Sequence, residues 1–141
     1  MSRWTHVAGL VRIDSVAHLL VGGDWKPSLT NFLADALPAG SEGPLQFQVV
    51  EKPDTPNSAC RGWVSIWGDL RDFGDEEEVA SIKAWIEKVF PPFDKIVEQK
   101  RDWFVRQGIV LVEDEMGKNS VVWGYSHEEG WPVHNKGWQS S

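Results

Sequence analysis

Few side chains in this sequence have the types and the spacing that metal chemistry requires. Its four histidines are His6, His18, His127 and His134, and they form no H-x-x-x-H or H-E-x-x-H pair. Zinc sites use several cysteine or histidine ligands at short, regular spacings, whereas Cys60 is the only cysteine here. His127, Glu128, Glu129 and His134 have the types to chelate a metal, but a solvated tail is the simpler interpretation. We therefore predict no metal site and no cofactor.

Nucleophilic and acid–base chemistry also have little support. Cys60 would need a neighbouring base to act as a nucleophile, and a buried or incidental thiol is the simpler interpretation. Asp69 and Arg71 lie two positions apart on a predicted strand, so we expect them to pair with each other, while Asp72 points away or enters a loop. The sequence contains no P-loop, no G-x-G-x-x-G and no G-x-S-x-G motif. We therefore predict that the protein is not an enzyme.

Tryptophan and arginine offer a different chemistry. The chain contains nine tryptophans, and Trp63, Ser65 and Trp67 alternate with Val64 and Ile66. Successive side chains of a strand point to opposite faces, so the first three residues share one face. Flat aromatic groups beside arginine can stack on nucleobases while the guanidinium holds phosphate. The same residue types also dominate the energetics of protein–protein interfaces.

The same alternation, applied to three predicted strands, collects ten candidate binding residues on one sheet face. They are Trp4, His6, Arg12, Gln46, Gln48, Arg61, Trp63, Ser65, Trp67 and Arg71. The opposite face of these strands is apolar and includes Val7, Val11, Ile13, Leu45, Phe47, Val49, Val64, Ile66 and Leu70. We expect helices to cover the apolar face, which leaves the candidate site on the other side.

The elements that position these residues follow from hydrophobic periodicity and turn residues. Strands are predicted over residues 3–13, 45–51, 61–71, 109–113 and 120–125. A helix is predicted over residues 26–37, with Leu29, Phe32, Leu33 and Leu37 on one face. A second helix starts at Asp75, where Glu76, Glu77 and Glu78 complement the helix dipole, and it reaches Phe90. After Pro91 and Pro92, a further helical piece is predicted from about residue 93 to residue 107.

This order of elements indicates an α+β fold of the ferredoxin-like βαββαβ type. Its antiparallel sheet would carry two helical segments on one face and an extra C-terminal strand. We expect a single domain over residues 1–126 and a C-terminal tail over residues 127–141, which has no clear period.

Three interpretations of the tryptophan-rich face stay open. In the first, the tryptophans belong to the core and are covered by the fifth strand or by the tail with Trp123, Trp131 and Trp138. Alternatively, the face is the interface of a homo-oligomer or of a complex with another protein. The third interpretation is a platform for a small ligand. Subunit joints often hold ligand pockets, so these interpretations are compatible.

Charge and composition restrict the partners. The net charge is −7 and the isoelectric point is about 5.0, which argues against long nucleic acids because these require clustered cations. A small anionic ligand is still compatible, because a local pocket can be basic on an acidic protein. No apolar stretch is long enough to span a membrane, and the first residues lack the apolar segment of a signal peptide. Together with the single cysteine, these features predict a cytoplasmic protein.

Three segments carry a resemblance to known proteins. They are Trp4-Thr5-His6-Val7, the string from Gly40 to Leu45, and the string from Val64 to Asp72. These segments are similar to small uncharacterised proteins of tailed phages and prophages. The resemblance covers a minor part of the chain and transfers no catalytic or binding residue. It implies an accessory protein that acts in the host cell cytoplasm, with a role against host defences.

The leading hypothesis is therefore a non-enzymatic binding protein that forms a homo-oligomer. It would capture a small, nucleotide-like anionic ligand, such as a host defence signal, through the Trp/Arg face or a subunit joint. The alternative is a protein–protein interaction module that inhibits or scaffolds a host or phage protein, with its acidic charge steering it to a basic partner.

Overall fold

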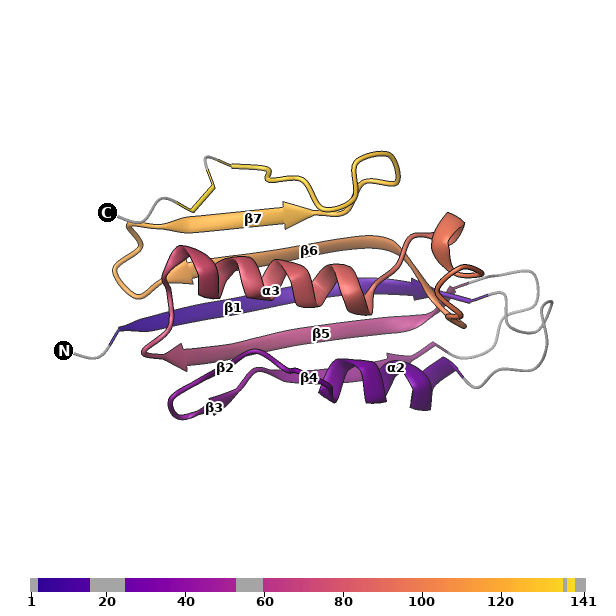
Figure 1. Cartoon of the computed structure of the whole chain (residues 1–141), viewed down its shortest axis with the longest axis horizontal. Helices are drawn as coiled ribbons and strands as arrows, with labels where there is room; N and C mark the ends of the chain where they lie inside the picture. Colours follow the sequence, from indigo (N-terminus) through magenta and orange to yellow (C-terminus); the bar gives the residue numbers. More distant parts are fainter. Residues whose placement is uncertain (1–2, 16–24, 53–59, 136, 139–141) are drawn as a thin grey trace.

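A five-stranded antiparallel sheet forms the centre of the molecule (Figure 1). The computed structural model describes residues 3–15, 25–52, 60–135 and 137–138. The strands of the sheet are β1 (Trp4–Asp14), β4 (Gln46–Glu51), β5 (Cys60–Arg71), β6 (Phe104–Asp114) and β7 (Ser120–Gly124). Their order across the sheet is β4-β5-β1-β6-β7, so β1 is the central strand. β2 (Ala39–Gly40) and β3 (Gly43–Pro44) form a separate two-stranded sheet.

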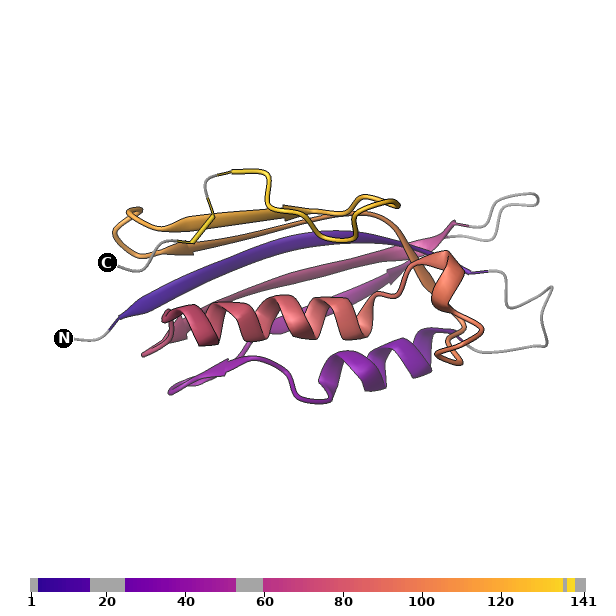
Figure 2. The same cartoon turned by 45° about the horizontal axis from the view of Figure 1, so that its top comes forward.

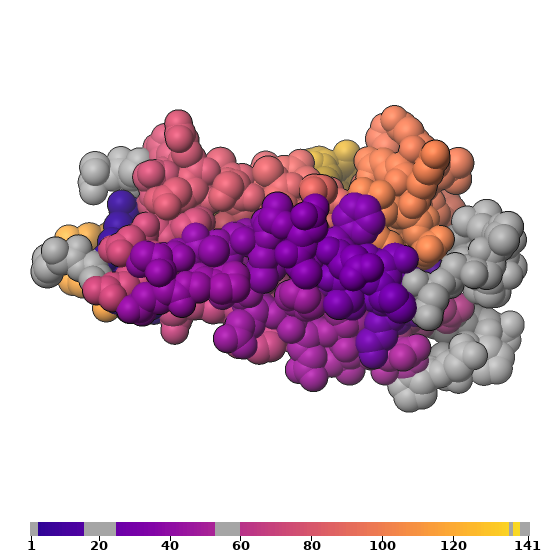
Figure 3. All heavy atoms as spheres, turned by 60° about the horizontal axis from the view of Figure 1, so that its bottom comes forward, coloured from indigo at the N-terminus to yellow at the C-terminus, as the bar shows by residue number. Residues whose placement is uncertain are grey.

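Two α-helices cover one face of this sheet (Figures 1 and 2). They are α2 (Trp25–Ala34) and α3 (Glu76–Val89), and both were expected from the apolar stripes of the sequence. α2 ends before the predicted position 37, and Ala36 has a φ of 53°, outside the helical region. In the space-filling view of this side, α2 and α3 form a continuous layer over the sheet (Figure 3).

The start of α3 shows how the local sequence sets a helix boundary. The side chain of Asp75 accepts a hydrogen bond of 2.8 Å from the backbone N–H of Glu78. The carboxylate of Glu78 in turn accepts one of 3.2 Å from the backbone N–H of Asp75. This reciprocal capping box satisfies N–H groups that have no partner within the helix. The prediction of a helix that starts at Asp75 is confirmed.

The prediction of a helical piece over residues 93–107 is wrong. Only a short 3-10 helix, η1 (Phe93–Lys95), forms there, followed by turns and then by β6 from Phe104 onward. Lys100 adopts a φ of 55°, which a right-handed helix cannot continue through. Trp103 is buried, and its indole N–H donates a hydrogen bond of 2.8 Å to the carbonyl of Val89. This anchor fixes the chain at the start of β6, so Phe104 and Val105 extend as a strand.

The class of fold predicted from the sequence is confirmed at the coarse level. The molecule is a mixed α+β structure with a five-stranded antiparallel sheet and two α-helices. The order β4-β5-β1-β6-β7, with β2 and β3 apart from it, does not establish the finer ferredoxin-like plan.

The hydrophobic core lies between the sheet and the helices. The apolar strand residues Val11, Ile13, Val64, Ile66 and Leu70 are buried there, as the alternation predicted. The buried stripe of α3 is complete and consists of Val79, Ile82, Trp85, Ile86, Val89 and the following Phe90. These contacts hold the helices on the side of the sheet opposite the ten candidate residues.

The tryptophans of the C-terminal segment pack on the same side as the helices. Trp131 is buried, with its ring centroid 6.4 Å from that of Phe90 and 5.5 Å from that of Tyr125. Trp123 is buried, and Trp138 donates a hydrogen bond of 3.2 Å from its indole N–H to the carbonyl of Gly74, just before α3. Val133 forms a bridge with Trp123, so the chain runs along the β7 edge of the sheet (Figure 1). These three tryptophans therefore do not cover the candidate face.

Candidate functional site

We use the name open face for the side of the sheet that α2 and α3 leave uncovered. Strand registers align its residues in rows across the sheet. The row of His6 contains Asp69, Glu113 and Ser120. The row of Ala8 contains Gln46, Trp67, Leu111 and Val122, and the row of Leu10 contains Gln48, Ser65, Ile109 and Gly124. The row of Arg12 contains Val50, Trp63 and Gln107, and Trp4 pairs with Arg71 at the opposite end.

The registers bring the ten predicted residues to this one face. Nine of them occupy the rows just described. Arg61 continues the alternation of β5 next to an irregularity in its pairing with β1. The sequence thus predicted their common placement, while their role in binding stays a prediction.

The middle of the open face is more apolar than the sequence set suggested. The large exposed side chains there are Leu10 (45% exposed), Trp67 (42%), Ile109 (55%) and Leu111 (36%), and Val50 (50%) is exposed in the row of Arg12. Four of these five are missing from the predicted set. The signal for Ile109 and Leu111 was their alternation with Val110 and Val112, because only one side of that apolar run can face the helices.

One end of the open face carries carboxylates. The Nδ1 atom of His6 lies 2.5 Å from Oδ1 of Asp69 on the neighbouring strand. Arg71 donates a hydrogen bond of 2.6 Å to Oε1 of Glu42, and its guanidinium lies 5.9 Å from the ring centroid of Trp4. His6 lies directly opposite Asp69 in the register, while the predicted pairing of Asp69 with Arg71 stays a prediction. Asp72 leaves the strand as predicted and accepts a hydrogen bond of 2.7 Å from Ser41.

The other end of the open face carries a buried carboxylate between two arginines. Asp14 is fully buried, and Arg12 donates from Nε to its Oδ1 at 3.0 Å. Arg106 donates from Nε to its Oδ2 at 3.2 Å. A buried carboxylate is tolerated only with such charge-assisted hydrogen bonds, and here two cations share one anion. The side chains of Arg12 and Arg106 are 30% and 57% exposed, so both also reach the surface.

Sequence reasoning missed both Asp14 and Arg106. The pairing of β1 with β6 shifts between Arg12 and Ile13, so Arg106 is the extra residue between Gln107, opposite Arg12, and Val105, opposite Ile13. The prediction of a helix over residues 93–107 removed Arg106 from the sheet. The position of Asp14 directly after the apolar residues of β1 was the available signal, because a charged residue there requires a partner.

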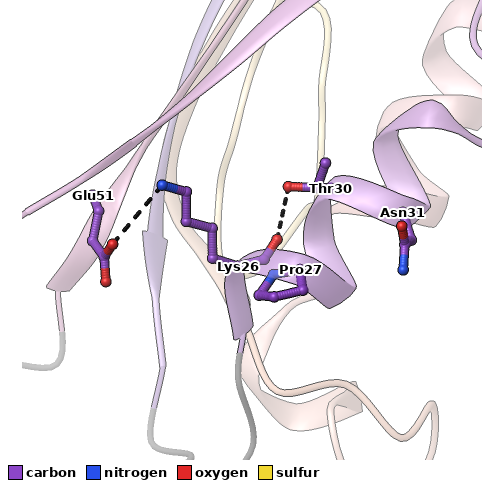
Figure 4. Close-up of a pocket in the computed structure, with 5 residues that line it drawn as sticks. All are labelled: Lys26, Pro27, Thr30, Asn31 and Glu51. Carbon is purple, nitrogen blue, oxygen red and sulfur yellow. Dashed lines mark hydrogen bonds and ion pairs between the residues drawn. The ribbon is translucent and has the colours of Figure 1, made fainter.

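Two hollows lie away from the open face. The first, of about 590 Å³, is lined by Lys26, Pro27, Thr30, Asn31 and Glu51 (Figure 4). Its polar groups are largely engaged, since Thr30 donates to the carbonyl of Lys26 at 2.8 Å and Lys26 lies 3.9 Å from Glu51. It therefore lacks converging groups available to orient a ligand.

The second hollow, of about 450 Å³, lies between the end of α3, η1 and the C-terminal segment. Its aromatic wall consists of Phe90, Tyr125 and Trp131. Burial and the charge of Asp94 raise the pKa of the Tyr125 phenol, while Arg106 acts in the opposite direction. The Tyr125 hydroxyl and the Trp131 indole nitrogen are buried without a hydrogen-bond partner among the described residues. Both atoms are sealed from solvent, so they do not line an accessible binding surface.

Three further features of the described part of the chain concern metal binding, disulfide formation and membrane insertion. In that part, no three side chains of histidine, cysteine, aspartate or glutamate come close enough together to hold a metal ion. Cys60 is buried and forms no disulfide. None of the described helices is both long enough and apolar enough to cross a membrane.

Comparisons with known proteins identify neither a family nor a function for this chain. The chain matches no model of a protein family, no curated protein and no solved structure. Its function must therefore be inferred from the open face itself.

Proposed function

We propose that this chain is a binding protein that uses its open face as a protein–protein interface. The observation that carries the proposal is the group of large apolar side chains exposed in the middle of this face, from Leu10 and Trp67 to Ile109 and Leu111. Contiguous apolar surface on a folded domain marks a site of interaction, because its exposure to water is unfavourable.

The arrangement of polar groups supports the same conclusion. Specific interfaces have an apolar centre with few charges and a polar rim, and they are enriched in aromatic residues and arginine. On the open face, the ionisable side chains lie at the two ends, in the rows of His6 and Arg12. Trp67 lies in the centre and Trp63 in the row of Arg12, and tryptophan is among the residue types that most often dominate binding energy.

This proposal can be tested by capture of partners in an extract of the cells that encode the chain. Ile109→Lys places a charge at the centre of the open face, whereas Val97→Lys changes an equally aliphatic, 79% exposed residue outside the sheet. The immobilised wild-type chain and Val97→Lys should retain the same partners, including soluble copies of the chain itself, and Ile109→Lys should lose them. Equal retention by all three baits would contradict the proposal.

A second candidate function is capture of a small, nucleotide-like anion, and one specific observation favours it. Asp14 holds the guanidinium groups of Arg12 and Arg106 in place, and Arg12 pairs across the strands with Trp63. The indole could stack on a base while the exposed guanidinium nitrogens bind phosphate. If the chain is a phage accessory protein, a host defence signal would be such a ligand.

The second candidate has its own test. A nucleotide that binds should raise the melting temperature of the wild-type chain and change its tryptophan fluorescence. Arg106→Gln retains a hydrogen-bond donor for Asp14 but removes the charge, so it should reduce both responses. Lys95→Gln removes a charge outside the sheet and should leave them unchanged. A response that Arg106→Gln does not reduce would exclude this site.

We also propose that the fold follows a ferredoxin-like plan with an added C-terminal strand. The support for this proposal is the position of β5, which lies between β1 and β4 and is antiparallel to both. In a split βαβ unit, the strand that is inserted has this position.

A further inference from the structure

We propose that the partner of the open face is a second copy of this chain, which packs face to face about a twofold axis. The axis runs parallel to the two sheets and perpendicular to their strands, between the row of Ala8 and the row of Leu10. This inference rests on the proposed function and adds to it the identity and the orientation of the partner.

The first support is the charge polarity of the face. Asp69 and Glu113 belong to the row of His6, at one end. Arg12 and Arg106 lie at the other end, where they share the single carboxylate of Asp14. The proposed axis reverses the strand direction of the second copy, so the acidic row of one copy faces the basic row of the other. Such electrostatic complementarity fixes the orientation in which two surfaces meet.

The second support is the match of side-chain sizes in the centre. The axis exchanges the row of Ala8 with the row of Leu10 and keeps each strand above its own copy. Leu10 then faces Ala8, and Trp67 faces Ser65, so a large side chain meets a small one at each position. Sheets that pack face to face at about 10 Å require this kind of interdigitation. On β6, Ile109 faces Leu111, so this pair adds apolar contact rather than a match of a large side chain with a small one.

A rival axis parallel to the strands fits the same face less well. It would keep each row in place and exchange β5 with β6. Asp69 would then face Glu113 of the other copy, and Arg12 would face its own equivalent. Like charges opposite each other are unfavourable, so charge selects the perpendicular axis.

The size of the face suits a reversible dimer. From Trp4 to Arg12, five strands span roughly 27 Å by 24 Å, so two copies would bury on the order of 1,200 Å². Specific protein complexes begin at about this size. We therefore expect an association that depends on concentration over the micromolar range.

Sedimentation of the purified full chain tests the existence of the dimer. The wild type and Val97→Lys should convert from monomer to dimer with rising concentration, whereas Ile109→Lys should stay monomeric with an unchanged circular dichroism spectrum. A wild type that stays monomeric over the whole range would overturn the inference, as would a dimer that Ile109→Lys leaves intact. If the chain is monomeric but still captures another protein through the open face, only this inference fails and the proposed function stands.

Cross-linking between single-cysteine variants tests the orientation, with Cys60 replaced by serine in each. Glu113 and Gln107 belong to the acidic and basic rows of the same strand. A mixture of Glu113→Cys and Gln107→Cys chains should be linked by a short bismaleimide, whereas each variant alone should not. The rival axis predicts links between Glu113→Cys and Asp69→Cys instead, and that result would overturn the proposed orientation.

Discussion

The most unusual single residue of this protein is Asp14. Its carboxylate is fully buried at the end of β1 and accepts charge-assisted hydrogen bonds from Arg12 and Arg106. In contrast, Asp69 pairs with His6 at the surface, where both side chains are about half exposed or more. The two aspartates lie at opposite ends of the open face and allow a direct comparison of buried and exposed pairs.

We predict that Asp14→Asn lowers the free energy of unfolding by about 1–3 kcal/mol, because it removes the charge that two guanidinium groups require. Asp69→Asn should lower it by less than about 1 kcal/mol, because water screens an exposed pair. Urea unfolding of both variants measures the difference. Equal losses would show that Asp14 contributes no more than a surface aspartate.

Tyr125 is the second residue with a specific expectation. It is the only tyrosine, and its hydroxyl is buried without a partner among the described residues. Tyr125→Phe should therefore raise the free energy of unfolding by about 1 kcal/mol at neutral pH. The raised pKa of the folded phenol means that the unfolded chain loses its proton first, near 10.0. Wild-type stability should thus fall as pH rises through this value, and the tyrosine-dependent part of the fall should be absent in Tyr125→Phe.

At the scale of elements, the sequence predicted most boundaries because local chemistry sets them. The capping box at Asp75 and the apolar stripe of α3 belong to one short stretch of chain, so periodicity was sufficient. β6 was different. Trp103 is held by the carbonyl of Val89, and the β-bulge beside Arg106 depends on pairing with β1. Both are tertiary contacts, and a local pattern of apolar residues could not distinguish them from a helix.

The capping box also gives a prediction at this scale. Asp75→Ala should lower the free energy of unfolding by about 1 kcal/mol, because the backbone N–H of Glu78 loses its acceptor. Glu76→Ala, in the same exposed first turn, removes a charge but no capping bond and should cost about 0.5 kcal/mol or less. Thermal unfolding of the two variants tests the difference. A loss for Asp75→Ala as small as that for Glu76→Ala would contradict the structural role of the box.

At the scale of the whole molecule, the sequence predicted which residues share the open face but not what the face is for. Alternation places residues on two sides of a strand, and this principle grouped Trp4, Arg12 and Trp67 correctly. It could not order the strands across the sheet. The exposed apolar centre of the open face and the opposite charges at its two ends are formed by β1, β5 and β6 together. They could be recognised only once the structure showed that these three strands are neighbours.

The charge polarity of the open face can be separated from the net charge of the chain. Two copies that each carry a charge of −7 repel one another, so removal of any carboxylate weakens this general repulsion equally. Glu113 differs from Glu76 because in the proposed dimer it would face Gln107, whose chain neighbour Arg106 and cross-strand neighbour Arg12 are both cationic. Glu113→Gln should therefore weaken the dimer relative to Glu76→Gln, although both variants have the same net charge.

The twofold axis doubles this effect, because each dimer contains two equivalent pairs. With an exposed pair contributing about 0.2–1 kcal/mol, the ratio of the two dissociation constants should be roughly two- to thirtyfold. Added salt screens the pairs, so the ratio should approach one at about 1 M NaCl, where the Debye length is about 3 Å. Sedimentation at low and high salt measures both constants. A ratio near one at low salt would place Glu113 outside the interface and contradict the proposed orientation.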